Sequence, residues 1–299
     1  MNTGAVRAGE IRAAEKEMGK LGCFVAGTLV HTREGLRPIE EIKVGDYVLS
    51  RSELDGNAEL CYQPVTRTYQ YDDREVYFVG MQIIDMPKLK AMDEYAYMVV
   101  TGGHPIWVNS LSGGGTEHEI NAWMRIEELY LKRYKPDWDI FSSRPTATVF
   151  LSDGRSAIIT FIEPLLQTED PDVAMNFDDD AGWKDGERYG SAIRFDPKGV
   201  LGAGIHNIGY ARNGIRYAIS WQARQEGWEL GVAPRWFDSN EHYSGYDCMS
   251  EMSLFKRTGG ALPMRRRVYN LEVANTHTYF VTEFGLWVHN TSISTLGTA

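Results

Sequence analysis

The chain has 299 residues, of which 43% are hydrophobic and 12% aromatic, enough to bury the core of one large domain or two ordinary ones. Its formal net charge is −10, so it offers no broad cationic surface for a phosphate backbone, and nucleic acid is not expected as a partner. No stretch is apolar for long enough to cross a bilayer, so no membrane insertion is expected. The three cysteines, Cys23, Cys61 and Cys248, are odd in number and far apart, which is not a disulfide framework or a zinc-knuckle spacing. We expect no cofactor and no metal.

The first part of the chain predicts β-structure after a helical lead-in. Residues 1–22 hold a run of good helix formers and end in glycine, which predicts a short N-terminal helix. From residue 23 onward, short β-prone runs alternate with turns, and residues 120–131 (INAWMRIEELYL) predict one or two turns of helix. The run TATVFLSDGRSAIITFI then predicts a hairpin with SDG at its turn. The fold class expected is all-β.

Residues 136–264 are expected to form a β-rich insertion, whose first strands can also belong to the main sheet. The segment is turn-rich, with a hairpin signal at Asn213-Gly214. It contains 12 basic and 19 acidic residues and so accounts for most of the negative charge of the chain. Residues 265–290 predict three further short strands, and residues 291–299 form a small-residue tail without a structural signal of its own.

Three sequence islands lie far apart along the chain: GCFVAGTLVHTREGLRPIEEIKVGDYVLS, TGGHPIWV and VYNLEVANTHTYFVTEFGLWVHN. Together they resemble the Hint superfamily of inteins, hedgehog autoprocessing domains and, most closely, the pretoxin Hint domains of bacterial polymorphic toxins. In that family a nucleophilic cysteine opens the domain, a TxxH motif follows, and His-Asn precedes the released segment. The resemblance covers residues 23–135 and 265–290 and implies a flattened horseshoe interrupted by the insertion.

The resemblance implies catalytic roles for the residues that match these motifs: Cys23, Thr101, His104, His277, His289 and Asn290. At the first scissile bond, the Cys23 thiolate can attack the carbonyl of Gly22 in an N–S acyl shift, with His104 as the expected proton donor. Thr101 would orient or stabilise this reaction.

At the second scissile bond, the side-chain amide of Asn290 can attack its own backbone carbonyl. This forms a succinimide and expels the amine of Thr291, which cleaves the chain without water as the nucleophile. Because an amide nitrogen is a poor nucleophile, the step needs a polarised carbonyl and a protonated leaving nitrogen. His289 and His277 are the candidates for these tasks.

The expected activity is therefore single-turnover autoproteolysis without a cofactor, which releases a covalently fused C-terminal effector. The resemblance implies a chain made in the bacterial cytoplasm as part of an exported toxin. One alternative is splicing, in which Thr291 accepts the thioester and the flanks are ligated. Asn270, which stands where inteins usually carry aspartate, favours cleavage over splicing. The other alternative is a non-catalytic scaffold whose insertion binds an immunity or delivery protein.

Each motif also has a simpler interpretation. A lone cysteine is most often a buried thiol, Thr101 and His104 could form an ordinary turn, and Asn290 could simply end a strand. His277 would equally suit an edge strand. The catalytic interpretation is favoured because the motifs occur together. His31, His118, His206 and His242 match no motif and are expected to be structural or exposed, and Asp178–Asp180 is expected to be a solvated acidic loop.

Overall fold

The computed structural model describes the following ranges: 22–84, 95–113, 116–133, 146–167, 171–177, 187–195, 201–211 and 262–290. The chain divides into two compact units. Unit 1 consists of Met1–Arg74, Val79–Ile162 and Arg267–Ala299, and unit 2 of Glu75–Phe78 and Glu163–Arg266. Apart from Gly22, the predicted N-terminal helix lies outside the described residues, as do the tail 291–299 and the Asn213-Gly214 turn.

The described part of the chain is built almost entirely of strands, which confirms the all-β class. The strands are β1 (Phe24–Val25), β2 (Leu29–Thr32), β3 (Gly35–Pro38), β4 (Tyr47–Ser50), β5 (Cys61–Glu75), β6 (Tyr77–Ile83), β7 (Tyr95–Val100), β8 (Pro105–Gly113), β9 (Thr116–Arg125), β10 (Thr146–Phe150), β11 (Ser156–Pro164), β12 (Leu166–Gln167), β13 (Val173–Phe177), β14 (Glu187–Phe195), β15 (Leu201–Ala211), β16 (Arg265–Val273), β17 (Thr278–Val281) and β18 (Leu286–His289). The helical segments are the 3-10 turn η1 (Ile39–Glu41) and α2 (Ile126–Arg133), which lies where the sequence predicts one or two helical turns. Among the described residues, no helix has the length and apolarity needed to cross a membrane.

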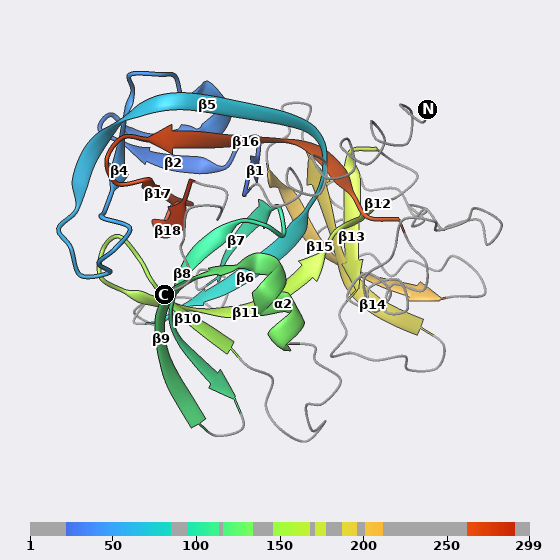
Figure 1. The fold of residues 1–299 in the computed structure, drawn as a ribbon. Helices are drawn as coiled ribbons and strands as arrows, with labels where there is room; N and C mark the ends of the chain where they lie inside the picture. Colours follow the sequence, from blue (N-terminus) through green and yellow to red (C-terminus); the bar gives the residue numbers. More distant parts are fainter. Residues whose placement is uncertain are drawn as a thin grey trace, which may run out of the picture. The chain divides into compact units, whose positions relative to one another are not determined.

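Strand pairing in the larger sheet interleaves strands from the first and last parts of the described sequence. Its order is β10-β11-β6-β7-β1-β16-β5-β4-β2-β17-β18-β8-β9, with β3 on β2, and the path closes because β10 also pairs with β8. The first strand, β1, therefore lies between β7 and β16, and the last strand, β18, between β17 and β8. Figure 1 shows β16 and β18, both from the C-terminal part of the sequence, among strands from the first half. β1 and β18 are thus strands of one sheet, with β16, β5, β4, β2 and β17 between them in its order.

A smaller, fully antiparallel sheet, β12-β13-β14-β15, belongs to unit 2. The sequence left open whether the strands at the start of the 136–264 insertion join the main sheet. β10 and β11 do so, since β10 pairs with both β8 and β11. In this part of the chain the second unit begins at Glu163, near the end of β11.

An aromatic cluster forms the part of the core that lies beneath the end of β18. Trp287 is 2% exposed, and its ring centroid lies 4.9 Å from that of Trp107 and 4.8 Å from that of Trp123. Phe280, from the neighbouring strand β17, stacks at 6.3 Å. Because large rings bury much apolar surface and lose little side-chain entropy, this cluster gives the last residues of β18 a rigid support.

Candidate active site

Thr101 holds the backbone of Cys23 on both sides. Cys23 lies immediately before β1, and Thr101 immediately after β7, the strand that pairs with β1. The Cys23 amide donates to Thr101 Oγ1 at 2.9 Å, and the Thr101 amide donates to the Cys23 carbonyl at 2.9 Å. Both residues are buried, at 1% and 5% exposed. These two bonds fix the peptide that precedes the candidate nucleophile.

Replacing Thr101 tests this arrangement. Thr101→Val keeps the shape of the side chain but leaves the buried Cys23 amide without its acceptor, which costs about 1–3 kcal/mol of unfolding free energy. Thr101→Ser keeps the oxygen and is expected to lose less. Urea unfolding of both variants measures the difference. Equal stability of the valine and serine variants would contradict the role of this hydrogen bond.

His104 lies against the first candidate scissile bond. It is fully buried, and its ring centroid lies 4.2 Å from that of Phe24. A Cβ added to Gly22 would meet His104 Nδ1 at 2.5 Å and His104 Cα at 2.7 Å, so only glycine fits here without displacing the imidazole. The ring therefore faces the peptide that joins Gly22 to Cys23. The Ile126 amide of α2 donates to the His104 carbonyl at 3.1 Å and anchors the residue from the other side.

Burial sets the protonation states of Cys23 and His104. It raises the pKa of the Cys23 thiol to about 12, against the opposing effect of the Arg74 charge. It lowers the pKa of His104 to about 3, with the Gly22 backbone acting in the opposite direction and the charge of His289 lowering it further. At neutral pH the pair is thus a thiol beside a neutral imidazole. The donor role expected of His104 requires that it first accept the proton of Cys23.

Hydrogen bonds hold the backbone of Asn290 at its amide and at its carbonyl. Asn290 is 5% exposed, and its backbone amide donates to the His277 carbonyl at 2.9 Å. Its own carbonyl oxygen accepts a hydrogen bond from Asn270 Nδ2 at 2.8 Å. Neither Nδ2 nor Oδ1 of Asn290 has a hydrogen-bond partner among the described residues. Since buried polar groups are nearly always paired, two unpaired atoms on one side chain point to a functional reason.

Asn270 connects the two candidate scissile bonds. In the β1–β16 pairing, Phe24 is opposite Tyr269, so continuing the register by one residue places Asn270 opposite Cys23. Asn270 Oδ1 accepts hydrogen bonds from the Leu271 amide and from the Tyr279 hydroxyl, both at 2.8 Å. Those two donors fix which way the amide group points, and its Nδ2 faces the Asn290 carbonyl.

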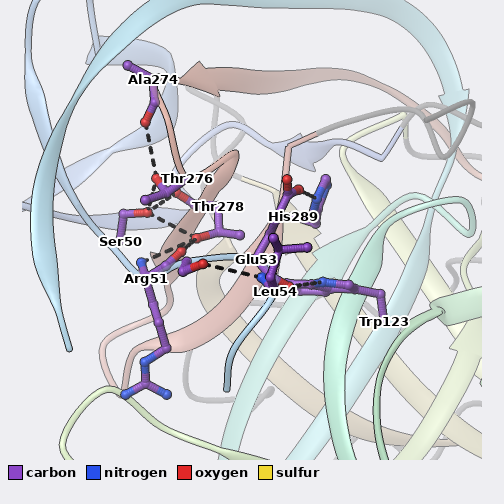
Figure 2. A network of polar contacts seen from close by, with 10 residues as sticks. Ser50, Arg51, Glu53, Leu54, Trp123, Ala274, Thr276, Thr278 and His289 are labelled. Carbon is purple, nitrogen blue, oxygen red and sulfur yellow. Dashed lines mark hydrogen bonds and ion pairs between the residues drawn. The ribbon is translucent and has the colours of Figure 1, made fainter. Parts of the chain in front are cut away.

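His289 is paired with a carboxylate that sequence reasoning missed. His289 is 2% exposed, and its Nε2 lies 2.5 Å from Glu53 Oε2. Trp123 packs edge-on against the imidazole at 4.9 Å and donates its Nε1–H to the Glu53 carbonyl at 3.1 Å, as Figure 2 shows. Burial lowers the pKa of His289, the Glu53 carboxylate raises it, and the charge of His277 lowers it. Glu53 lies in a turn and belongs to no motif, so no sequence signal marked it.

A network of hydroxyl groups holds the segment around His277, which has a φ of 54°. Ser50 Oγ lies 2.6 Å from Thr276 Oγ1 and donates to the Thr278 carbonyl at 2.7 Å. Thr278 Oγ1 donates in turn to the Arg51 carbonyl at 2.6 Å (Figure 2). A left-handed backbone at a non-glycine residue costs about 1–3 kcal/mol and persists only where its surroundings hold it, as this network does.

The structure therefore describes five of the six predicted catalytic side chains as buried, and His277 as half-buried. Cys23, Thr101 and His104 lie together, and the charge of His289 reaches His104. Thr291 lies outside the described residues. Of the histidines without a motif, His31 bonds the Thr282 carbonyl at 2.8 Å and His118 is exposed. Within the described ranges, no three His, Cys, Asp or Glu side chains gather closely enough to hold a metal ion.

No protein-family model and no curated protein sequence matches the chain. The structure is similar to a bacterial intein-like domain from Clostridium thermocellum, at 14% identity and a TM-score of 0.39, over 90% of this chain and 98% of that one. It is also similar to a DnaB intein from Synechocystis sp. PCC 6803, at 10% identity and a TM-score of 0.37, over 90% and 99%. The gp41-1 intein is similar at 11% identity and a TM-score of 0.37, over 90% of this chain and 98% of that one. All three TM-scores lie below 0.5.

Proposed function

We propose that this chain is a Hint-type self-processing domain, which cleaves the Asn290–Thr291 bond once per molecule by cyclisation of Asn290. The observation that supports this most directly is the state of Asn290. Its buried side-chain amide has no partner among the described residues, while its backbone carbonyl already accepts a hydrogen bond. The large majority of buried side-chain polar atoms in proteins are paired, so an amide with both of its atoms unpaired supports a reactive role for Asn290.

In the proposed step, Asn290 Nδ2 attacks the Asn290 carbonyl carbon and forms a five-membered succinimide ring. The bond from that carbon to the Thr291 nitrogen breaks, one proton leaves Nδ2, and one proton is added to the departing amine. Attacking and attacked atoms belong to one residue, so proximity supplies roughly 7–11 kcal/mol of the barrier reduction. His289 is the proposed proton donor, because Glu53 supports its charged form.

The N-terminal reaction is the slower one in this proposal. A thiol with a pKa of about 12 is almost entirely protonated at neutral pH, so the N–S acyl shift depends on proton transfer to the neutral His104. Cleavage at Asn290 therefore proceeds without a prior thioester. The product released is the segment fused behind Asn290, and a toxic effector fits the resemblance to pretoxin domains. Splicing and a non-catalytic scaffold that binds an immunity or delivery protein are the alternatives.

The test is intact-mass spectrometry of the chain fused at its C-terminus to a folded reporter, followed over time. We expect a fragment that ends at Asn290 as a succinimide, one water lighter than a fragment with a free C-terminal asparagine. A ligated product of the two flanks would support splicing instead. Full-length mass at every time point would overturn the proposal and favour the scaffold.

The Glu53–His289 pair gives this activity a predicted pH dependence. If the protonated His289 donates to the leaving amine, the rate rises as the pH falls through the pKa of His289, which lies below its ordinary value. Glu53→Gln removes the group that raises this pKa, so the rise moves to lower pH and cleavage at pH 7 slows roughly tenfold. Glu59→Gln, an exposed residue on the same loop, is the control. A pH profile that Glu53→Gln leaves unmoved would exclude this role.

A further inference from the structure

We infer that Asn270 is a catalytic residue for cleavage at Asn290, and that its side-chain amide stabilises the negative charge that develops on the Asn290 carbonyl oxygen. This inference rests on the proposed function. It assigns the polarisation of the scissile carbonyl to a residue for which the sequence suggested only a preference between cleavage and splicing.

The hydrogen-bond network around Asn270 gives its amide one orientation. Oδ1 accepts from the Leu271 amide and from the Tyr279 hydroxyl, both at 2.8 Å. With the oxygen engaged by two donors, Nδ2 is left to donate to the Asn290 oxygen at 2.8 Å. Asn270 is 4% exposed and Tyr279 is fully buried. The donor is thus oriented before the reaction and shielded from water, the condition under which such donors contribute most to rate.

The reaction creates charge at the atom that this donor touches. When Asn290 Nδ2 adds to the carbonyl carbon, the electron pair of the C=O bond moves onto the oxygen. The hydrogen bond from Asn270 strengthens as that charge grows and weakens again when the Thr291 amine leaves. No bond to Asn270 forms or breaks. Removing one preorganised donor of this kind typically slows a reaction about 10²- to 10³-fold.

The residue type matters, because an ionised carboxylate at this position has no proton to donate. An aspartate here could donate only when protonated, and burial raises the pKa of a carboxyl group. Asn270→Asp therefore replaces a permanent hydrogen-bond donor with a carboxyl group that donates only at low pH, when it is protonated. The nearby Cys23 thiol and Tyr279 hydroxyl do not titrate between about pH 5 and 8, since burial raises the pKa of both. His277 and His289 are present in the wild type and in every variant, so dividing each rate by that of the wild type at the same pH removes their contribution.

The experiment measures cleavage of the reporter fusion between about pH 5 and 8 for wild type, Asn270→Ala and Asn270→Asp. We expect Asn270→Ala to be about 10²- to 10³-fold slower at every pH. At pH 8, Asn270→Asp should be slowed relative to wild type as much as Asn270→Ala is. At pH 5, the slowing of Asn270→Asp should be at least about tenfold smaller. Asn109→Asp, at a buried asparagine in β8, serves as the matched control for a carboxyl group placed in the sheet and should follow wild type.

Three outcomes would overturn the assignment: rates for both variants within about twofold of wild type, an Asn270→Asp deficit that does not change with pH, or the same deficit in Asn109→Asp. If the Asn270 variants do not fold, Tyr279→Phe replaces them. That change removes one of the two donors that orient the amide and should slow cleavage several-fold, whereas an unchanged rate would exclude the orientation. A wild-type fusion that never cleaves would overturn the proposed function and this inference with it.

Discussion

Asn290→Ala is expected to leave the reporter fusion uncleaved under all conditions. The change removes the only atom that can form the succinimide while leaving the backbone in place, including the carbonyl that Asn270 contacts and the amide that bonds the His277 carbonyl. Asn290→Gln keeps an amide but displaces it by one methylene, and a misplacement of about 1 Å costs roughly 10²-fold in rate. Time-resolved intact-mass spectrometry measures both.

The control for this pair is Asn109→Ala, which removes another buried asparagine of the same sheet and should cleave like wild type. Cleavage of the Asn290→Ala fusion at the same bond and at the wild-type rate would show that another group or a contaminating protease breaks it. A fragment of Asn290→Ala that ends elsewhere would identify a different scissile bond.

Within the candidate active site, local sequence indicates Cys23 and Asn290 but does not indicate which side chains contact them. Cys23 and Asn290 stand in short islands with recognisable neighbours, so both can be identified from local sequence. Asn270 and Glu53 contact partners that are close only in the folded chain. The contact of Asn270 with Asn290 joins β16 to the residue after β18, two strands that are not neighbours in the sheet, and that of Glu53 with His289 joins residues 236 positions apart. Local sequence carries no information about either contact, because both depend on how distant strands pair.

The alternation of short β-prone runs and turns was sufficient to predict the all-β class, but it did not decide where the strands pair. The β10–β11 hairpin follows the expected SDG turn. Its membership of the main sheet depends on the pairing of Ala147 with Leu111 on β8, a contact between residues that are distant in sequence. The protonation states could not be predicted either, because they follow from burial. The thiol of Cys23 in isolation would have an ordinary pKa, and only its 1% exposure raises it to about 12.

Trp287→Ala is expected to lower the free energy of unfolding by about 3–5 kcal/mol, the usual cost of truncating a buried tryptophan. The ring lies within 5 Å of the Trp107 and Trp123 ring centroids, so its loss opens a cavity that these rings cannot close. Trp287→Phe keeps most of the packing. It also removes an indole N–H that has no partner among the described residues. The free energy of unfolding of Trp287→Phe should therefore fall much less than that of Trp287→Ala. Urea unfolding in the uncleavable Asn290→Ala background measures both.

The same variant connects the core to the reaction. Trp123 packs against Trp287 on one side and against His289 on the other, and it also bonds the Glu53 carbonyl. Emptying the Trp287 position should therefore loosen the Glu53–His289 pair and slow cleavage even at temperatures where the protein is fully folded. Leu151→Ala, a fully buried residue of the same unit, controls for a general loss of stability. If Trp287→Ala and Leu151→Ala slow cleavage equally for equal destabilisation, the aromatic cluster supports the fold alone, and the position of His289 is set by Glu53 and the β17–β18 pairing.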